Sequence, residues 1–153
     1  MSSDEAFLVT LLRALRQSKL EAVIVGNTAA VLQGAPVTTQ DIDLLVRDSK
    51  LTSAKVEDLA QRLGAFRARP SELVDITTLL GASAPVDVIV GHIAGDLRFE
   101  SVKSRARIIS VAGEEALVAD LADIIRSKEA ANREKDRAVL PMLRATLAVR
   151  QGC

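Results

Sequence analysis

Residues 23–46, VIVGNTAAVLQGAPVTTQDIDLLV, contain two apolar stretches, each next to residues suited to binding a ligand. The first stretch runs into Gly26 and Asn27, and the second contains Asp41-Ile42-Asp43. Because side chains alternate between the two faces of a strand, Asp41 and Asp43 share one face and Ile42 lies on the other. Two carboxylates this close repel each other unless a proton or a cation separates them. The segment therefore predicts a sheet that carries a cation site.

The turn at Gly26 and Asn27 is suited to a phosphate. These residues end the first strand and open a helix, so the backbone N–H groups there can face an anion. Mg²⁺ takes oxygen ligands from one or two carboxylates and completes its shell with substrate phosphates. We therefore expect a phosphate-binding turn and a metal-binding carboxylate pair on adjacent strands.

Composition restricts the class of protein further. The chain has 153 residues, 48% of them apolar, so a single domain over residues 1–153 with its own core is expected. No apolar run is long enough to span a membrane, and the N-terminus lacks a signal-peptide pattern. The one cysteine, Cys153, excludes an intrachain disulfide and favours the cytoplasm. A net charge of zero, with no Tyr or Trp, argues against a basic nucleic-acid coat or a base-stacking surface.

Apolar spacing and chain breakers predict an α/β (α+β) fold. Helices are predicted over residues 3–18, 27–33, 51–63, 121–131 and 133–149. Strands are predicted over residues 21–25, 41–46, 65–69, 73–79 and 86–90, and a hairpin over 105–111 and 115–118 turning at Gly113-Glu114. Residues 91–104 show no clear period. Asp120 is expected to cap its helix with Asp123 in the capping-box position, and Pro141 is expected to kink the last helix.

Asp87 is a third carboxylate, placed on an apolar strand. In Val86-Asp87-Val88-Ile89-Val90 the three valines share one face, and Asp87 shares the other with Ile89. Burying a carboxylate without a partner is costly. A metal held by Asp41 and Asp43 would supply the partner, but a salt bridge or a strand end in water would also satisfy it. Asp75, on the preceding strand, is a competing candidate.

A second cluster of polar residues lies near the C-terminus, in the run Ser127-Lys128-x-x-Ala131-x-Arg133-x-Lys135-Asp136. Lys128 lies near the end of one predicted helix, and Asp136 lies in the first turns of the next. One interpretation is a solvated charged turn between two surface helices. The other is functional: Lys128 binds a triphosphate, and Arg133 or Lys135 orients the turn.

These residues resemble the nucleotidyltransferase superfamily related to DNA polymerase beta. The resemblance rests on Gly26-Asn27, Thr39, Asp41-Ile42-Asp43, Asp87 and the run from Ser127 to Asp136. Within the superfamily the chain is most similar to the minimal and abortive-infection-type toxin nucleotidyltransferases of bacteria and archaea. The match extends from about residue 20 to residue 145, so it covers nearly the whole chain.

The resemblance implies a mixed sheet flanked by helices, with further helices at the C-terminus. It implies an enzyme that transfers a nucleoside monophosphate from an NTP with two Mg²⁺ ions. Asp41 and Asp43 would be metal ligands, and Asp87 would be the third carboxylate, which also activates the acceptor hydroxyl. Gly26 and Asn27 would bind phosphate, and Thr39, Lys128 and Asp136 would complete the nucleotide site. The acceptor would be an RNA such as tRNA, or a protein, and an antitoxin or HEPN-type protein would be the partner.

Three positions depart from the family pattern. Asn27 replaces the usual Gly or Ser, Gln33 stands where a His is common, and Val37 stands where an Arg often follows the proline. A second hypothesis is therefore a degenerate nucleotidyltransferase fold that binds a nucleotide or a partner without turnover. A third is a structural α/β domain whose Asp-x-Asp is a solvated strand end.

Overall fold

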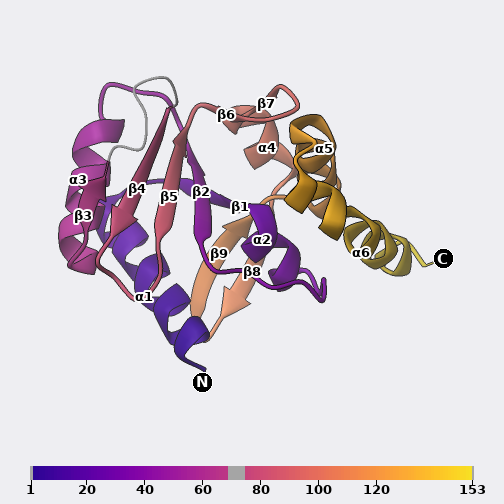
Figure 1. Cartoon of the computed structure of the whole chain (residues 1–153). Helices are drawn as coiled ribbons and strands as arrows, with labels where there is room; N and C mark the ends of the chain where they lie inside the picture. The colour runs from indigo at the N-terminus through magenta and orange to yellow at the C-terminus, as the bar shows by residue number, and fades with distance from the viewer. Residues whose placement is uncertain (1, 69–74, 153) are drawn as a thin grey trace.

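A mixed sheet of seven strands organises the protein, as the computed structural model shows for residues 2–68 and 75–152 (Figure 1). The helices are α1 (Ser3–Ser18), α2 (Gly26–Leu32), α3 (Thr52–Leu63), α4 (Phe99–Arg105), α5 (Leu121–Ala131) and α6 (Glu134–Arg150). The strands are β1 (Ala22–Val25), β2 (Ile42–Val46), β3 (Phe66–Ala68), β4 (Ile76–Leu80), β5 (Val86–Val90), β6 (His92–Ile93), β7 (Leu97–Arg98), β8 (Arg107–Val111) and β9 (Glu114–Val118).

The strand order places β2 and β5 side by side at the centre of the sheet. The order is β3-β4-β5-β2-β1-β9-β8, and β6 and β7 form a separate small hairpin. β2 runs parallel to β5 and antiparallel to β1, whereas β1 runs parallel to β9. A parallel pair needs a long connection, which α3 and the β3–β4 hairpin provide between β2 and β5. The predicted fold class, a mixed sheet flanked by helices, is confirmed.

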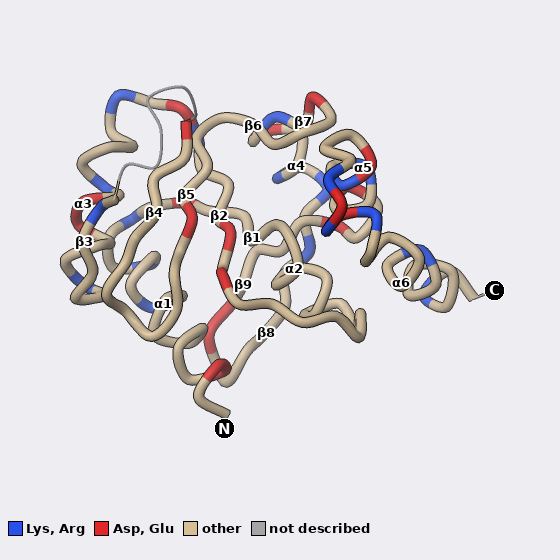
Figure 2. The backbone as a smooth tube through the Cα atoms, viewed as in Figure 1, with Lys and Arg blue, Asp and Glu red and all other residues tan. Residues whose placement is uncertain are grey.

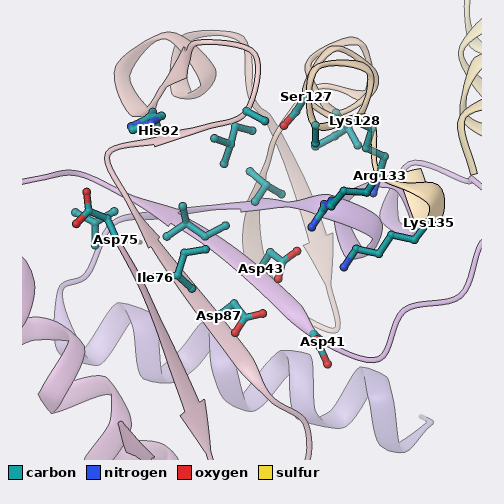
Figure 3. A pocket seen from close by; sticks show the side chains of 18 residues that line it. Asp41, Asp43, Asp75, Ile76, Asp87, His92, Ser127, Lys128, Arg133 and Lys135 are labelled. Atoms are coloured by element: carbon teal, nitrogen blue, oxygen red, sulfur yellow. The ribbon is translucent and has the colours of Figure 1, made fainter. Parts of the chain in front are cut away.

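Helix α1 covers the core on the sheet face that lies away from the viewer in Figure 3. Ser2 caps it by accepting a hydrogen bond from the backbone N–H of Glu5 at 3.2 Å, and Lys19 ends it in a left-handed conformation. Its apolar residues recur at helical spacing and pack against α3 and the β8–β9 hairpin. Leu11 of α1 is fully buried, as are Leu44 of β2 and Val88 of β5.

Gln33, just after α2, joins three parts of the chain. Its side-chain nitrogen donates to the carbonyls of Ala29 and Ala119 at 3.0 and 2.8 Å. Its side-chain oxygen accepts from the backbone N–H of Leu121 and from the Arg150 guanidinium, both at 3.0 Å. Gln33 therefore ties α2 to the start of α5 and to the end of α6.

The carboxylate that bonds back to the start of its own helix is Asp136 of α6, not Asp123 of α5. Asp120 does cap α5, accepting from the backbone N–H of Ala122 at 3.1 Å. Asp123, in contrast, accepts from the Arg105 guanidinium at 2.8 Å, because that charge is within reach and the Asp123 side chain is buried. At α6, Asp136 makes one half of a capping box, because its side chain accepts from the backbone N–H of Arg133 at 3.1 Å, whereas an arginine side chain has no acceptor for the other half. The predicted capping-box role of Asp123 is therefore wrong.

Other boundaries also differ from the predictions. Residues 91–104 show no clear periodicity of apolar residues, and they form β6, β7 and most of α4. These elements are too short to give a recognisable periodicity. The β8–β9 hairpin is confirmed, but it turns at residues 112–113, one residue earlier than expected. Asp41 lies in a bend directly before β2, not within the strand. Strands expected over 65–69 and 73–79 appear as β3 and β4, while residues 69, 73 and 74, like Cys153, lie outside the described residues.

Candidate functional site

Asp43 of β2 and Asp87 of β5 face each other across two parallel strands. They are register partners, so their side chains project from the same face of the sheet (Figure 3). Asp87 also accepts a hydrogen bond from the Thr78 hydroxyl of β4 at 2.6 Å. The valines on either side of Asp87 are fully buried on the opposite face. The predicted convergence of these two carboxylates is present in the structure.

The crowding of carboxylates has an electrostatic consequence at Asp43. Burial raises the pKa of Asp43, and the neighbouring Asp87 and Asp41 carboxylates raise it further, to about 6 from its ordinary value of 3.8. The Lys128 ammonium acts in the opposite direction. The pair therefore favours any cation, or a proton, that reduces the repulsion between its members.

Asp41 lies at the exposed end of this cluster, one residue before β2. Its backbone carbonyl is held by two hydroxyls, that of Thr39 at 2.7 Å and that of Thr28 at 3.1 Å. Thr39 therefore fixes the bend that presents Asp41, and it does not line the cavity beside the carboxylates. Within residues 2–68 and 75–152, no three His, Cys, Asp or Glu side chains already surround one point as a metal shell. Asp41 would have to turn toward Asp43 and Asp87 to complete one.

Gly26 is required by the geometry of the site. Its backbone has a φ of +68°, in the left-handed region, and a Cβ there would lie 2.5 Å from Asp43 Oδ2. Only glycine fits both conditions. Asn27 lies beside it but outside the cavity lining: its side-chain nitrogen donates to the Thr38 carbonyl at 3.2 Å. Its side-chain oxygen is buried with no hydrogen-bond partner among the described residues.

A cavity of about 600 Å³ separates the carboxylates from a cluster of cations on the α5–α6 turn (Figure 3). Along the backbone, acidic residues lie on β2 and β5, and basic residues lie near α5 (Figure 2). Lys128, Arg133 and Lys135 line this side. The Lys128 side chain is largely buried, which lowers the pKa of its ammonium, while the charges of Asp136 and Asp43 oppose that shift. The two sides are opposite in charge, as a metal-bound polyphosphate requires.

The rest of the cavity wall is mostly apolar, with two polar side chains at the end far from Lys128. Asp75 and His92 are labelled there in Figure 3, and both line the cavity. The apolar lining consists of Val25, Ile76, Ile89, Val90, Ile93, Ala94, Ile124 and Ala131. The cavity can therefore enclose a ligand with an anionic end and a less polar body.

Thr78 and Gln33 are polar residues whose roles the sequence does not reveal. Thr78 pairs in register with Asp87 across the antiparallel β4–β5 ladder, which brings its hydroxyl to the carboxylate. A threonine in a strand is ordinary, so only knowledge of strand pairing could identify it. Gln33 stands where a His is common in the family, and this difference was the only feature of the sequence that drew attention to it.

The pH dependence of stability should report on the carboxylate pair. The pKa of Asp43 is higher in the folded than in the unfolded chain, so without metal its contribution to stability is greatest below pH 4 and is lost as pH rises through about 6. Relative to wild type, Asp43→Asn should gain up to about 3 kcal/mol in unfolding free energy between these limits. Urea unfolding of both proteins at several pH values in EDTA measures this. A difference that does not change with pH would contradict it.

The fold has solved counterparts, although no protein-family model matches the sequence and no curated protein matches it. ANT(2")-Ia in complex with adenylyl-2"-tobramycin is 15% identical, with a TM-score of 0.69 over 98% of this chain and 92% of that one. TM1012 of Thermotoga maritima, regarded as a nucleotidyltransferase, is 17% identical, with a TM-score of 0.68 over 92% and 93%. An antigenic nucleotidyltransferase-like protein from Paracoccidioides brasiliensis is 17% identical, with a TM-score of 0.57 over 97% and 78%.

These similarities define the fold of the chain. It is the nucleotidyltransferase fold, as the resemblance in sequence predicted. The match to ANT(2")-Ia covers 98% of this chain, so it extends over nearly all of its helices and strands. In the part of the chain that the structure describes, no helix is long and apolar enough to cross a membrane.

Proposed function

We propose that the protein is a Mg²⁺-dependent nucleotidyltransferase that moves a nucleoside monophosphate from an NTP to a hydroxyl group. The observation that carries the proposal is the Asp43–Asp87 register pair, which faces Lys128 across the cavity. Asp41, Asp43 and Asp87 offer only carboxylate oxygens, the donors that Mg²⁺ prefers. When bound, one or two Mg²⁺ ions would neutralise the charge of the phosphates and of the attacking and leaving oxygens.

The residues of the chain divide the work between the two sides of the cavity. On the cationic side, Lys128, Arg133 and Lys135 hold the triphosphate and stabilise the pyrophosphate as it leaves. On the other side, Asp87 accepts the proton of the acceptor hydroxyl. At the same time the hydroxyl oxygen bonds to the α-phosphorus, and the bond from the α-phosphorus to the oxygen that bridges to the β-phosphate breaks. Gly26 leaves space for a phosphate beside Asp43, since any side chain would occupy it.

The acceptor is proposed from the chemistry of the site and of its counterparts. ANT(2")-Ia was solved with an adenylylated tobramycin, so this fold can act on a small hydroxyl-bearing acceptor. The resemblance to toxin nucleotidyltransferases favours an RNA such as tRNA, or a protein, and with it a role in a toxin–antitoxin pair in the cytoplasm. An antitoxin or a HEPN-type protein would then bind the same chain.

A second candidate is a binding module without turnover, and the environment of Asn27 favours it. The Asn27 side chain is directed to Thr38 rather than to the cavity, so it adds no phosphate contact of its own. Val37 likewise removes a cation that related chains often carry. Such a protein would bind Mg²⁺–NTP but would not transfer the nucleotide.

One experiment separates the two functions. Thermal stability is measured with Mg²⁺ and each NTP, and α-labelled NTP is then incubated with tRNA, candidate proteins and tobramycin. A ligand present at a hundred times its dissociation constant should add about 2.7 kcal/mol of stability. Label on any acceptor supports the enzyme. NTP binding without label in any acceptor supports the binding module, and no stabilisation by any NTP contradicts both.

Lys128→Ala should weaken NTP binding about tenfold or more, since a charge-assisted contact to phosphate is worth about 1.5–3 kcal/mol. Mg²⁺ binding to the carboxylates should change little. Calorimetric titration with Mg²⁺–NTP measures the effect. Lys103→Ala is the matched control, because Lys103 forms an ion pair with Glu21 on the surface and does not line the cavity. An equal loss of affinity in both variants would contradict a specific role for Lys128.

A further inference from the structure

Asp136 is a fully buried carboxylate that does not line the cavity. It is 0% exposed, although it lies at the third position of α6, where a capping carboxylate needs no burial. Taking a charge out of water is costly unless ionic partners compensate. The partners of Asp136 therefore indicate what it does.

The two oxygens of Asp136 have different partners. Oδ2 accepts from the backbone N–H of Arg133 at 3.1 Å and from its Nε at 2.7 Å. Oδ1 accepts from the Arg133 Nη2 at 3.2 Å and lies 3.6 Å from the Lys128 ammonium. Although burial acts in the other direction, these partners hold the pKa of Asp136 below its ordinary value. One buried anion thus contacts two of the three cations that line the cavity.

Lys128 depends on this anion more than Arg133 does. Its side chain is only 12% exposed, whereas that of Arg133 is 58% exposed. A lysine is flexible and readily loses its charge when buried, whereas an arginine stays charged. The charge of Asp136, 3.6 Å from the Lys128 ammonium, opposes the effect of burial on Lys128, and Asp136 itself lies outside the cavity lining.

We infer that Asp136 is a positioning residue, which acts on the nucleotide through Lys128 and does not touch it. The inference rests on the proposed nucleotide site, but it needs only NTP binding and not turnover. Without Asp136, the Lys128 side chain would lose both its anchor and its compensating charge. Asp136→Asn should therefore weaken Mg²⁺–NTP binding about five- to tenfold, close to the loss expected for Lys128→Ala.

A double-mutant cycle tests the inference on two readouts, NTP affinity and unfolding free energy. On the Lys128→Ala background, Asp136→Asn should change NTP affinity less than about twofold, because the residue it acts through is gone. Its effect on stability, through the hydrogen bond from the Arg133 backbone N–H, should persist on both backgrounds. The cycle uses saturating Mg²⁺ and whichever of ATP, GTP, CTP and UTP binds most tightly.

Asp123→Asn is the matched control. Asp123 is also a buried carboxylate in the third position of a helix, but its two partners, Arg105 and Arg126, do not line the cavity. It should cost stability without changing NTP affinity. Equal losses of affinity for Asp123→Asn and Asp136→Asn would show a structural effect and overturn the inference.

Other results would overturn it as well. These are an additive loss of affinity in the double variant, or unchanged or tighter binding by Asp136→Asn alone. If Asp136→Asn does not fold, the same cycle is run with Asp136→Glu, which moves the charge by one methylene, and unchanged affinity in that variant overturns the inference. A wild-type protein that binds no NTP overturns the proposed function itself, a different outcome from an additive cycle.

Discussion

Asp43→Ala is expected to abolish nucleotide transfer while leaving the metal-free protein as stable as wild type or more stable. The carboxylate is needed to hold Mg²⁺, whose contribution of several kcal/mol corresponds to a loss of about 10³-fold or more. In the absence of metal its removal relieves repulsion from Asp87 and Asp41. Asp41→Ala should lose activity in the same way. Label transfer and thermal unfolding in EDTA measure the two effects.

The control for these variants is Asp75→Ala. Asp75 also lines the cavity, but it lies apart from the carboxylate pair (Figure 3). It should retain most of the activity, which would separate the pair from a general need for negative charge. A fall of several °C in the melting temperature of both Asp41→Ala and Asp43→Ala would instead identify these residues as members of structural salt bridges.

Gly26→Ala is expected to have the second largest effect. The left-handed backbone costs an alanine about 1–2 kcal/mol. The new Cβ would also lie 2.5 Å from Asp43 Oδ2, so the Asp43 carboxylate must leave its present position. We expect a loss of stability and a loss of Mg²⁺ and NTP binding together, measured by unfolding and by calorimetry.

Gly64→Ala measures the cost of the left-handed backbone without a contact to Asp43. Gly64 has a φ of +66°, almost the same as that of Gly26, but nothing lies within 4 Å of the position of a Cβ. The unfolding free energy of Gly64→Ala should therefore fall only by the cost of the left-handed conformation, and ligand binding should not change. If Gly26→Ala and Gly64→Ala give the same result in unfolding and in ligand binding, the contact with Asp43 is unimportant.

The central strands could be predicted from the sequence because local rules determine them. Alternation of residues places Asp43 and Asp87 on the strand faces opposite Leu44 and Val88, and the apolar content of β2 and β5 is typical of strands in the centre of a sheet. The hairpin of β8 and β9 also follows from alternation around a glycine turn. Pattern alone, however, did not choose between a metal site and a salt bridge for Asp87.

What could not be predicted depends on contacts between distant residues. Asp123 pairs with Arg105, and Thr78 bonds to Asp87, because helices and strands pack in a particular order. No local rule selects these partners. The dual role of Asp136, as cap and as partner of Lys128, likewise appears only when α5 and α6 pack together.

The register of β2 and β5 has a consequence for how related sequences can change in length. Adding or removing one residue inside β5 before Asp87 would turn every following side chain to the other face of the sheet. Asp87 would then point into the core, and a valine would face Asp43. Insertions and deletions should therefore accumulate in the connection after β4, at residues 81–85, and be absent within the two strands. An alignment of homologous sequences would test this evolutionary constraint without any experiment on the protein.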